Sequence, residues 1–394
     1  MALDEQLLDD PAALEAADPR AVLRSLAGAG AQVRQAMALT QESLPPTWAD
    51  GGRPRAVVVA ARGGAAVVGD ALAAVVGGAG PVPVLALSGA RLPSWVGSMD
   101  VVVAISLSGR AEGAVAVATE AGRRGAQLLT VGMTGSPLEQ VSLRFRGAHV
   151  PLPVDRSAAT TPTSRTALWS LLTGPLLACD RLGLLPPDAS GGEHDLAAVA
   201  DALDAEAEAC RPSSESFVNP AKGLAMEIDG SVSVILGDSP LAGVAGRRAA
   251  SVLARTARVP AVHGMLPDDA GDVVATFGGP FASDPSDEVF ADPFLDGPAA
   301  TRLRLLLLDL GDGIGFGAVR ELAERSGVRV SDVRAHTELG DDLGSSVLGP
   351  AETPMQRFAR VVARVDFAAT YLALATGLDP AVSPHVAELR DSLR

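Results

Sequence analysis

Short apolar runs alternate with helix-like patterns between residues 50 and 185. The runs at 101–105 (VVVAI) and 127–131 (QLLTV) are typical of buried strands, because consecutive apolar residues suit a strand that is covered on both faces. Helical spacing of apolar residues follows most of these runs, which predicts a parallel sheet between two helical layers. The predicted strands are 56–61, 82–87, 101–105, 127–131 and 148–152, and the predicted helices are about 65–76, 112–122 and 165–184.

The same alternation starts again after a turn-rich stretch at 186–193 (PPDASGGE), which is typical of a linker. The second half therefore repeats the first, and we expect two tandem α/β domains, each a three-layer α/β/α sandwich of the flavodoxin-like kind. The predicted strands of the second half are 231–236, 272–277 (DVVATF), 302–310 and 328–333, and its predicted helices are about 195–209, 242–257, 316–326, 354–376 and a last helix ending at 394.

The chain of 394 residues is long enough for two domains with full cores. Apolar residues recur at helical spacing in the first 45 residues, and two prolines then end that pattern. We therefore divide the chain into an N-terminal helical segment at 1–48, a first α/β domain at 49–186, a linker with a helix at 187–216, and a second α/β domain with C-terminal helices at 217–394.

Charge and composition exclude several classes of partner. A net charge of −15 argues against nucleic acid, since the chain repels polyanions. The N-terminus (MALDEQLLDD) is acidic and does not resemble a signal peptide, and no apolar run is long enough to span a membrane, so we expect a cytoplasmic protein. Cys179 and Cys210 have no histidines at metal-binding spacing, and we expect neither a metal nor an organic cofactor.

The turn after the strand at 101–105 is the strongest candidate site. Its sequence is Ser106-Leu107-Ser108-Gly109-Arg110, and an alanine-rich helix follows it. A tight turn from a strand into a helix places free backbone N–H groups and hydroxyls at a positive helix end, where phosphate is the usual occupant. The alternative is that Ser106 and Ser108 only close the turn.

Two stretches of the chain resemble one family. Residues 104–138 (AISLSGRAEGAVAVATEAGRRGAQLLTVGMTGSPL) resemble the sugar isomerase (SIS) domain, which binds a phosphosugar at its Ser-x-Ser-Gly turn. Residues 361–393 (VVARVDFAATYLALATGLDPAVSPHVAELRDSL) are similar to the end of the bifunctional phosphoglucose/phosphomannose isomerases, and 219–225 (NPAKGLA) resemble the opening of that family's second domain. The resemblance implies two tandem SIS domains, a hexose 6-phosphate ligand, aldose–ketose isomerisation and a homodimer.

The resemblance implies roles for several residues. The family's first turn, Gly-Met-Gly-Gly-Ser, matches Ala61-Arg62-Gly63-Gly64-Ala65, which keeps the paired glycines and lacks the hydroxyl. Its second turn keeps Ser106, Ser108 and Gly109, replaces a threonine by Ala111 and adds Arg110, whose guanidinium either binds phosphate or points to solvent. Arg165 matches an arginine that steadies the negatively charged enediol, although it is also placed to begin a helix.

The catalytic base is where the chain departs from the family. The family's glutamate and histidine fall on Arg255 and Gly271, and its terminal lysine falls on Arg390. A guanidinium does not readily exchange a proton near neutral pH, so the base and the ring-opening group are both replaced. Candidate substitutes lie nearby: His263, and the carboxylates of Asp268, Asp269 and Asp272.

Three interpretations follow from these residues. The first is an isomerase of hexose 6-phosphates that uses substitute groups. The second is a catalytically silent protein that binds a sugar phosphate and has a regulatory role. The third is a structural dimer partner whose pocket is inactive.

Overall fold

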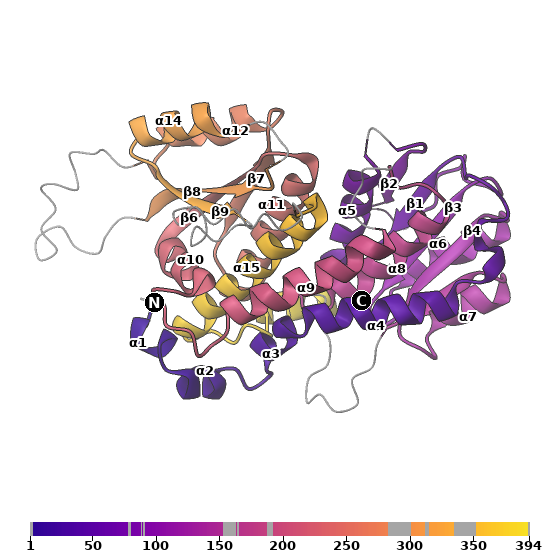
Figure 1. Cartoon of the computed structure of the whole chain (residues 1–394), viewed down its shortest axis with the longest axis horizontal. Helices are drawn as coiled ribbons and strands as arrows, with labels where there is room; N and C mark the ends of the chain where they lie inside the picture. The colour runs from indigo at the N-terminus through magenta and orange to yellow at the C-terminus, as the bar shows by residue number, and fades with distance from the viewer. Residues whose placement is uncertain are drawn as a thin grey trace, which may run out of the picture. The chain divides into compact units, whose positions relative to one another are not determined.

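The chain folds into two compact units, one of residues Ala27–Asp204 and one that combines Met1–Leu26 with Ala205–Arg394 (Figure 1). The computed structural model describes residues 3–77, 80–87, 89, 91–152, 163, 165–186, 192–282, 301–311, 315–334 and 352–392. Residues 155–164, 280–300 and 340–350, for which the sequence predicts no strand or helix, lie almost entirely outside the described residues.

The first unit contains a five-stranded parallel sheet in the order β2-β1-β3-β4-β5. Its strands are β1 (Val57–Ala60), β2 (Val84–Leu87), β3 (Val101–Ser106), β4 (Gln127–Gly132) and β5 (Ala148–Pro151). All four residues of β1 and all six of β3 are buried, because these central strands are covered on both faces. The five strands predicted from the apolar runs are therefore present, with their ends shifted by one or two residues.

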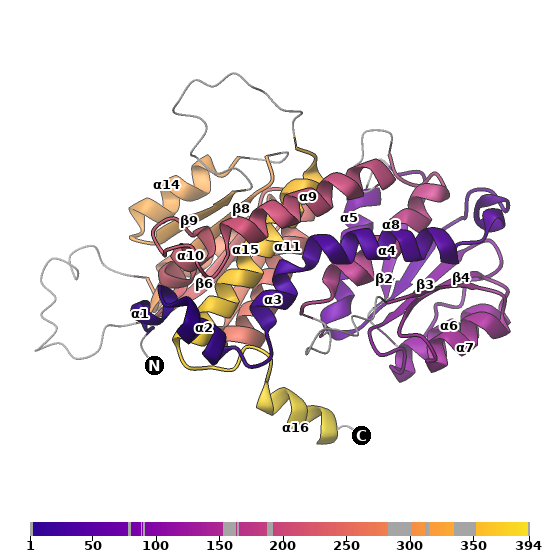
Figure 2. The same ribbon diagram turned by 60° about the horizontal axis from the view of Figure 1, so that its bottom comes forward.

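Helices cover both faces of this sheet. The α6 and α7 helices pack together on one face, whereas α4, α5 and α8 lie on the other, with α4 and α8 side by side (Figures 1 and 2). Between the sheet and α6 lies a core cluster that includes Val102, Ala104 and Val117. The helices of this unit are α4 (Ala29–Ser43), α5 (Ala66–Val76), α6 (Glu112–Arg123), α7 (Pro137–Arg144), α8 (Leu168–Arg181) and the first part of α9 (Glu193–Ala209), with 3-10 turns at Pro46–Ala49 and Gly63–Ala65.

The second unit repeats this architecture with four described parallel strands in the order β7-β6-β8-β9. They are β6 (Ser231–Gly237), β7 (Ala261–Met265), β8 (Arg302–Asp309) and β9 (Arg329–Arg334). This order matches β2-β1-β3-β4 of the first sheet. The chain is thus α/β with two parallel sheets, as the sequence predicted.

One predicted strand of the second half is wrong. Residues 272–277 form the end of α12 (Ala270–Ala275) and a 3-10 turn (Thr276–Gly278). Val273 and Phe277 lie four residues apart, so both face the core from one side of this helical segment. The strand next to β6 is β7 instead, whose apolar pattern is weak because it lies at the sheet edge and exposes Val262 and His263.

The second sheet is also covered on both faces. The α12 and α14 helices lie on one face, while α10, α11 and α15 lie on the other (Figure 1). Almost the whole of α15 is buried, which explains its long apolar sequence. The helices of this unit are α1 (Glu5–Leu8), α2 (Pro11–Ala17), α3 (Val22–Ala27), the rest of α9, α10 (Pro220–Ile228), α11 (Pro240–Val252) with a π-helical turn (Leu253–Ala257), α12, α14 (Gly317–Arg325), α15 (Pro354–Ala375) and α16 (Pro384–Ser392). Among the described residues, no helix has the length and apolar character needed to cross a bilayer.

Candidate functional site

The first candidate site lies where β1 and β3 end. The chain leaves β1 through α5 toward β2 and leaves β3 through α6 toward β4, so the connections diverge between these two neighbouring strands. In open α/β sheets ligands bind at such a switch point, outside the carboxyl ends of the strands. Because β1 and β3 are parallel neighbours, Gly63 and Gly64 and the turn Ser106–Arg110 leave the same edge of the sheet.

The serines of this turn make the contacts that close it. The Oγ atom of Ser106, which is only 5% exposed, accepts the amide N–H of Ala111 at 3.3 Å. The Oγ atom of Ser108 accepts the amide N–H of Arg110 at 3.3 Å, and Ser108 is exposed. A hydroxyl that accepts one hydrogen bond still has its own proton to donate. Both serines therefore shape the turn and keep a donor for a ligand.

Two glycines with positive φ shape this edge, and one of them leaves its backbone accessible. Gly63 has a φ of +61°, and a Cβ atom built on it meets nothing within 4 Å, so its surroundings are open. Gly109 has a φ of +65°, a left-handed conformation that favours glycine. Arg62, Gly63 and Arg110 are exposed here. We call the backbone and side chains of 62–64 and 106–111 the cradle.

Arg165 belongs to the same unit and precedes α8. Its amide N–H donates to the Oγ1 atom of Thr163 at 3.3 Å, and its side chain is half-buried. Arg165 lies three residues before α8 begins at Leu168. A role of the Arg165 guanidinium toward a reacting sugar stays a prediction.

The candidate proton-transfer groups lie in the other unit. His263 is exposed on the edge strand β7, where contact with its neighbours partly desolvates the imidazole and lowers its pKa, with a further contribution from the positive charge of Arg247. Arg255 lies in the π-helical turn after α11, and Gly271 lies in the first turn of α12. His263 thus stays a candidate base, and its surroundings are described only within the second unit.

The aspartates near His263 serve the fold of this segment. Asp269 precedes α12, and its Oδ2 atom accepts the amide N–H of Met265 at 2.9 Å. Asp272 lies in the first turn of α12, where its negative charge interacts favourably with the positive end of the helix. Asp268 and Asp269 thus lie in the turn before α12, and Asp272 lies in its first turn.

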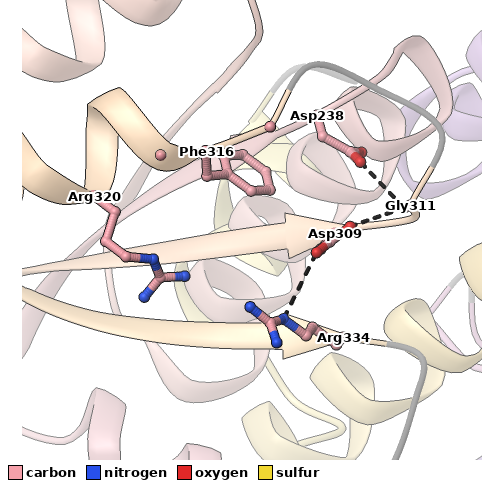
Figure 3. Close-up of a pocket in the computed structure, with 8 residues that line it drawn as sticks. Asp238, Asp309, Gly311, Phe316, Arg320 and Arg334 are labelled. Atoms are coloured by element: carbon pink, nitrogen blue, oxygen red, sulfur yellow. Dashed lines mark hydrogen bonds and ion pairs between the residues drawn. The ribbon is translucent and has the colours of Figure 1, made fainter.

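A second strand-end site was not predicted from the sequence. A cavity of about 350 Å³ lies at the carboxyl ends of β6, β8 and β9, within the second unit (Figure 3). It occupies the switch point between β6 and β8, the counterpart of the cradle position. Its lining consists of Asp238, Asp309, Gly311, Gly315, Phe316, Gly317, Arg320 and Arg334.

Two carboxylates converge in this cavity. The amide N–H of Gly311 lies 2.8 Å from Oδ1 of Asp309 and 3.2 Å from Oδ2 of Asp238 (Figure 3). Asp238 is 5% exposed, and its burial raises its pKa, as does the neighbouring charge of Asp309, against the lowering effect of its hydrogen bonds. The sequence signal for this site is one aspartate at the end of each apolar strand. Asp238 directly follows β6, and Asp309 is the last residue of β8.

One known family model matches the second half of the chain. The two parallel α/β sandwiches share one strand order, and each has a switch-point site. Residues 217–393 match the model of the bacterial phospho-glucose isomerase C-terminal SIS domain. The second half of the chain is therefore similar to the SIS domain of bacterial phosphoglucose isomerases, as its C-terminal motifs predicted. No curated protein sequence matches it significantly.

Solved structures share the fold along nearly the whole chain. A "putative phosphosugar isomerase" from Clostridium difficile 630 superposes with a TM-score of 0.65 at 12% identity, covering 92% of this chain and 95% of its own. Glucosamine-6-phosphate deaminase from Thermotoga maritima gives a TM-score of 0.61 at 12% identity, with coverage of 92% and 97%. A hypothetical protein from Thermus thermophilus gives 0.59 at 15% identity, with coverage of 100% and 98%. At these identities the likeness shows the fold alone.

Proposed function

We propose that the protein binds a hexose 6-phosphate or a related phosphosugar, with the phosphate held in the cradle. The observation that carries this proposal is the position of the cradle at the β1/β3 switch point, where Ser106, Ser108 and Gly63 leave the same sheet edge. Supporting it are SIS-type relatives named for acting on phosphosugars.

The electrostatics of the cradle favour an anion. The α6 helix has 12 residues, and the partial positive charge of its N-terminus lies at the end of the turn. Arg62, directly before the paired glycines, and Arg110, in the second turn, are exposed and add positive charge to the cradle. Glu112, in the first turn of α6, is the nearest negative residue in sequence. A phosphate therefore meets amides, hydroxyls and guanidiniums at one edge.

Isomerisation is the first candidate activity. An aldose–ketose isomerase moves a proton between C1 and C2, so it needs a base near the carbonyl end of the sugar. In this chain the base would be His263, and Arg165 would stabilise the enediolate. The protein would then act as a homodimer, as the family resemblance implies, and in the cytoplasm, as the N-terminal sequence suggests.

A silent binding protein is the second candidate. Arg255 and Gly271 stand at the family's glutamate and histidine positions, and neither residue moves protons near neutral pH. The cradle residues are still present although the family's glutamate and histidine are replaced. Binding without turnover would suit a regulatory partner that responds to sugar-phosphate concentration.

Two measurements, made one after the other, test the proposal. Fructose 6-phosphate is expected to raise the melting temperature, because a ligand that binds only the native state stabilises it. The absence of a shift at about 10 mM ligand would overturn the phosphosugar site, since a dissociation constant near 1 mM already gives about 1.4 kcal/mol. A coupled assay for conversion of glucose 6-phosphate or mannose 6-phosphate to fructose 6-phosphate then separates the two candidates.

A further inference from the structure

The two switch points occupy equivalent positions with opposite charge. Ser106 is the last residue of β3 and pairs with the last residue of β4. Asp309 is the last residue of β8 and likewise pairs with the last residue of β9. By register, a carboxylate in the second sheet therefore replaces the hydroxyl that begins the cradle in the first.

The neighbouring strand shows the same reversal. Continuing the β1/β3 pairing beyond Ala60 and Ala104 brings Arg62 level with Ser106. Continuing the β6/β8 pairing beyond its last pair brings Asp238 level with Asp309. The first sheet thus has a cation where the second has a buried anion. A phosphate suits the first position, whereas the two carboxylates at the second disfavour an anion beside them.

Most charges that face the second cavity are compensated. Asp309 lies 3.6 Å from Nε of Arg334. Arg320 pairs with Asp332, which also lies 3.8 Å from Arg334. Asp238 differs, because its partners are the hydroxyl of Ser239 and two backbone amides, and no ion pair of the described residues includes it.

Asp238 therefore keeps an almost fully buried carboxylate that forms no ion pair with the part of the chain that the structure describes. Burying such a charge is costly unless a cation compensates it. Its hydrogen bonds are between 3.1 and 3.4 Å, which is long for contacts to an ionised carboxylate. A cationic group that enters the cavity would supply the missing partner.

The size and lining of the cavity narrow the ligand further. A volume of about 350 Å³ lies at the lower end of the range for small-molecule pockets and suits a group of hexose size. Gly315 and Gly317 have open space where a side chain would lie, whereas Gly311 lies against the guanidinium of Arg357. Phe316 offers an apolar ring face (Figure 3). The guanidiniums of Arg320 and Arg334 are partly exposed and can donate to hydroxyl oxygens.

We propose that this cavity binds a small hydroxyl-rich ligand that carries a protonated amine, the chemistry of an amino sugar. The ammonium group lies between Asp238 and Asp309, which one group can contact together because both accept from the same amide of Gly311. The hydroxyl groups face the two arginines. The second site is thus separate from the cradle and gives the protein a second ligand that does not need a phosphate.

Calorimetric titration of the full-length protein with glucosamine tests this proposal. N-acetylglucosamine and glucose serve as probes of similar size without the ammonium charge. We expect glucosamine to bind at least tenfold more tightly than either neutral sugar. Asp238→Asn and Asp309→Asn should each weaken glucosamine binding at least tenfold, whereas Glu324→Gln, which removes an exposed carboxylate from α14 outside the cavity, should leave it unchanged.

Several outcomes would overturn the proposal. The first is that glucosamine does not bind the wild-type protein. The second is that N-acetylglucosamine binds as tightly as glucosamine. The third is that both asparagine variants bind glucosamine as tightly as the wild type does. If Asp238→Asn does not fold, Asp309→Asn alone decides, because Asp309 is partly exposed. The double variant Ser106→Ala/Ser108→Ala separates the two sites: glucosamine binding that persists supports the second cavity, and its loss would assign glucosamine to the cradle instead.

Discussion

Gly109 lies directly against Ser136, so the turns after β3 and β4 are packed onto each other. A Cβ atom on Gly109 would lie 2.1 Å from Oγ of Ser136, which is buried and caps α7 through the amide of Glu139. The carbonyl of Gly109 also accepts the amide N–H of Leu138 at 3.1 Å. The shape of the cradle therefore depends on a neighbouring turn that does not itself belong to the cradle.

Gly109→Ala should destabilise the protein by about 3 kcal/mol, because a left-handed alanine is strained and its methyl group overlaps Ser136. Gly135→Ala is the matched control. Its φ is +72°, but nothing lies within 4 Å of the built Cβ, so only the backbone strain of about 1 kcal/mol remains. Urea denaturation of both variants measures the difference. Equal losses would contradict the close packing of the two turns.

Ser106→Ala/Ser108→Ala should remove the thermal shift that fructose 6-phosphate produces, because both hydroxyl donors of the cradle are then missing. The variant itself should unfold at a lower temperature, since Ala111 loses the partner of its amide. The quantity compared is therefore the shift with and without ligand within each variant. Ser94→Ala, an exposed serine of the same unit, should keep the full shift. A full shift in the double variant would place the phosphate elsewhere.

His263→Ala should abolish turnover if the protein is an isomerase, and Arg165→Ala should slow it by about 100-fold, a typical loss for one electrostatic donor. The coupled assay measures both variants, and the thermal shift with fructose 6-phosphate confirms that each still binds its ligand. Turnover that survives both changes would remove these residues from the mechanism.

The sequence predicted the fold better than the sites, for physical reasons. The buried run at 101–105 identified β3, because a central parallel strand is apolar on both faces. β7 has no such signal, since it lies at a sheet edge and is partly exposed. Residues 272–277 (DVVATF) were predicted as a strand instead, because their apolar content suits a helix as well as a strand. Asp238 and Asp309 are single polar residues 71 positions apart, and only strand register shows that they meet.

The ion pair between Arg248 on α11 and Asp366 on α15 should be strongly coupled, because their side chains are only 5% and 7% exposed. Arg248→Met leaves the carboxylate of Asp366 buried without this partner, which should cost about 3–5 kcal/mol. The double variant Arg248→Met/Asp366→Leu should recover most of that loss, since both charges are then gone. Urea denaturation of the two single variants and the double variant gives the coupling energy. Additive losses would show that the pair is not coupled.

Cys179 should make the protein less stable at alkaline pH. Burial of its thiol in α8 raises its pKa to about 12, while an exposed thiol of the unfolded chain ionises near 9.0. The folded protein therefore retains a proton that the unfolded chain loses, so the stabilisation is complete below pH 9 and is lost as the pH rises toward 12. At about pH 10.5 the expected loss is about 2 kcal/mol relative to about pH 8.

Cys179→Ala removes this contribution, and its cavity cost does not depend on pH. The stability of the variant should therefore fall by about 2 kcal/mol less than that of the wild type between these two pH values. Cys210, whose pKa is also raised by burial, is present in both proteins and cancels in the difference. Urea denaturation in a reducing buffer at each pH measures the four free energies. Parallel losses in the two proteins would show that the Cys179 thiol ionises equally in the folded and unfolded chains.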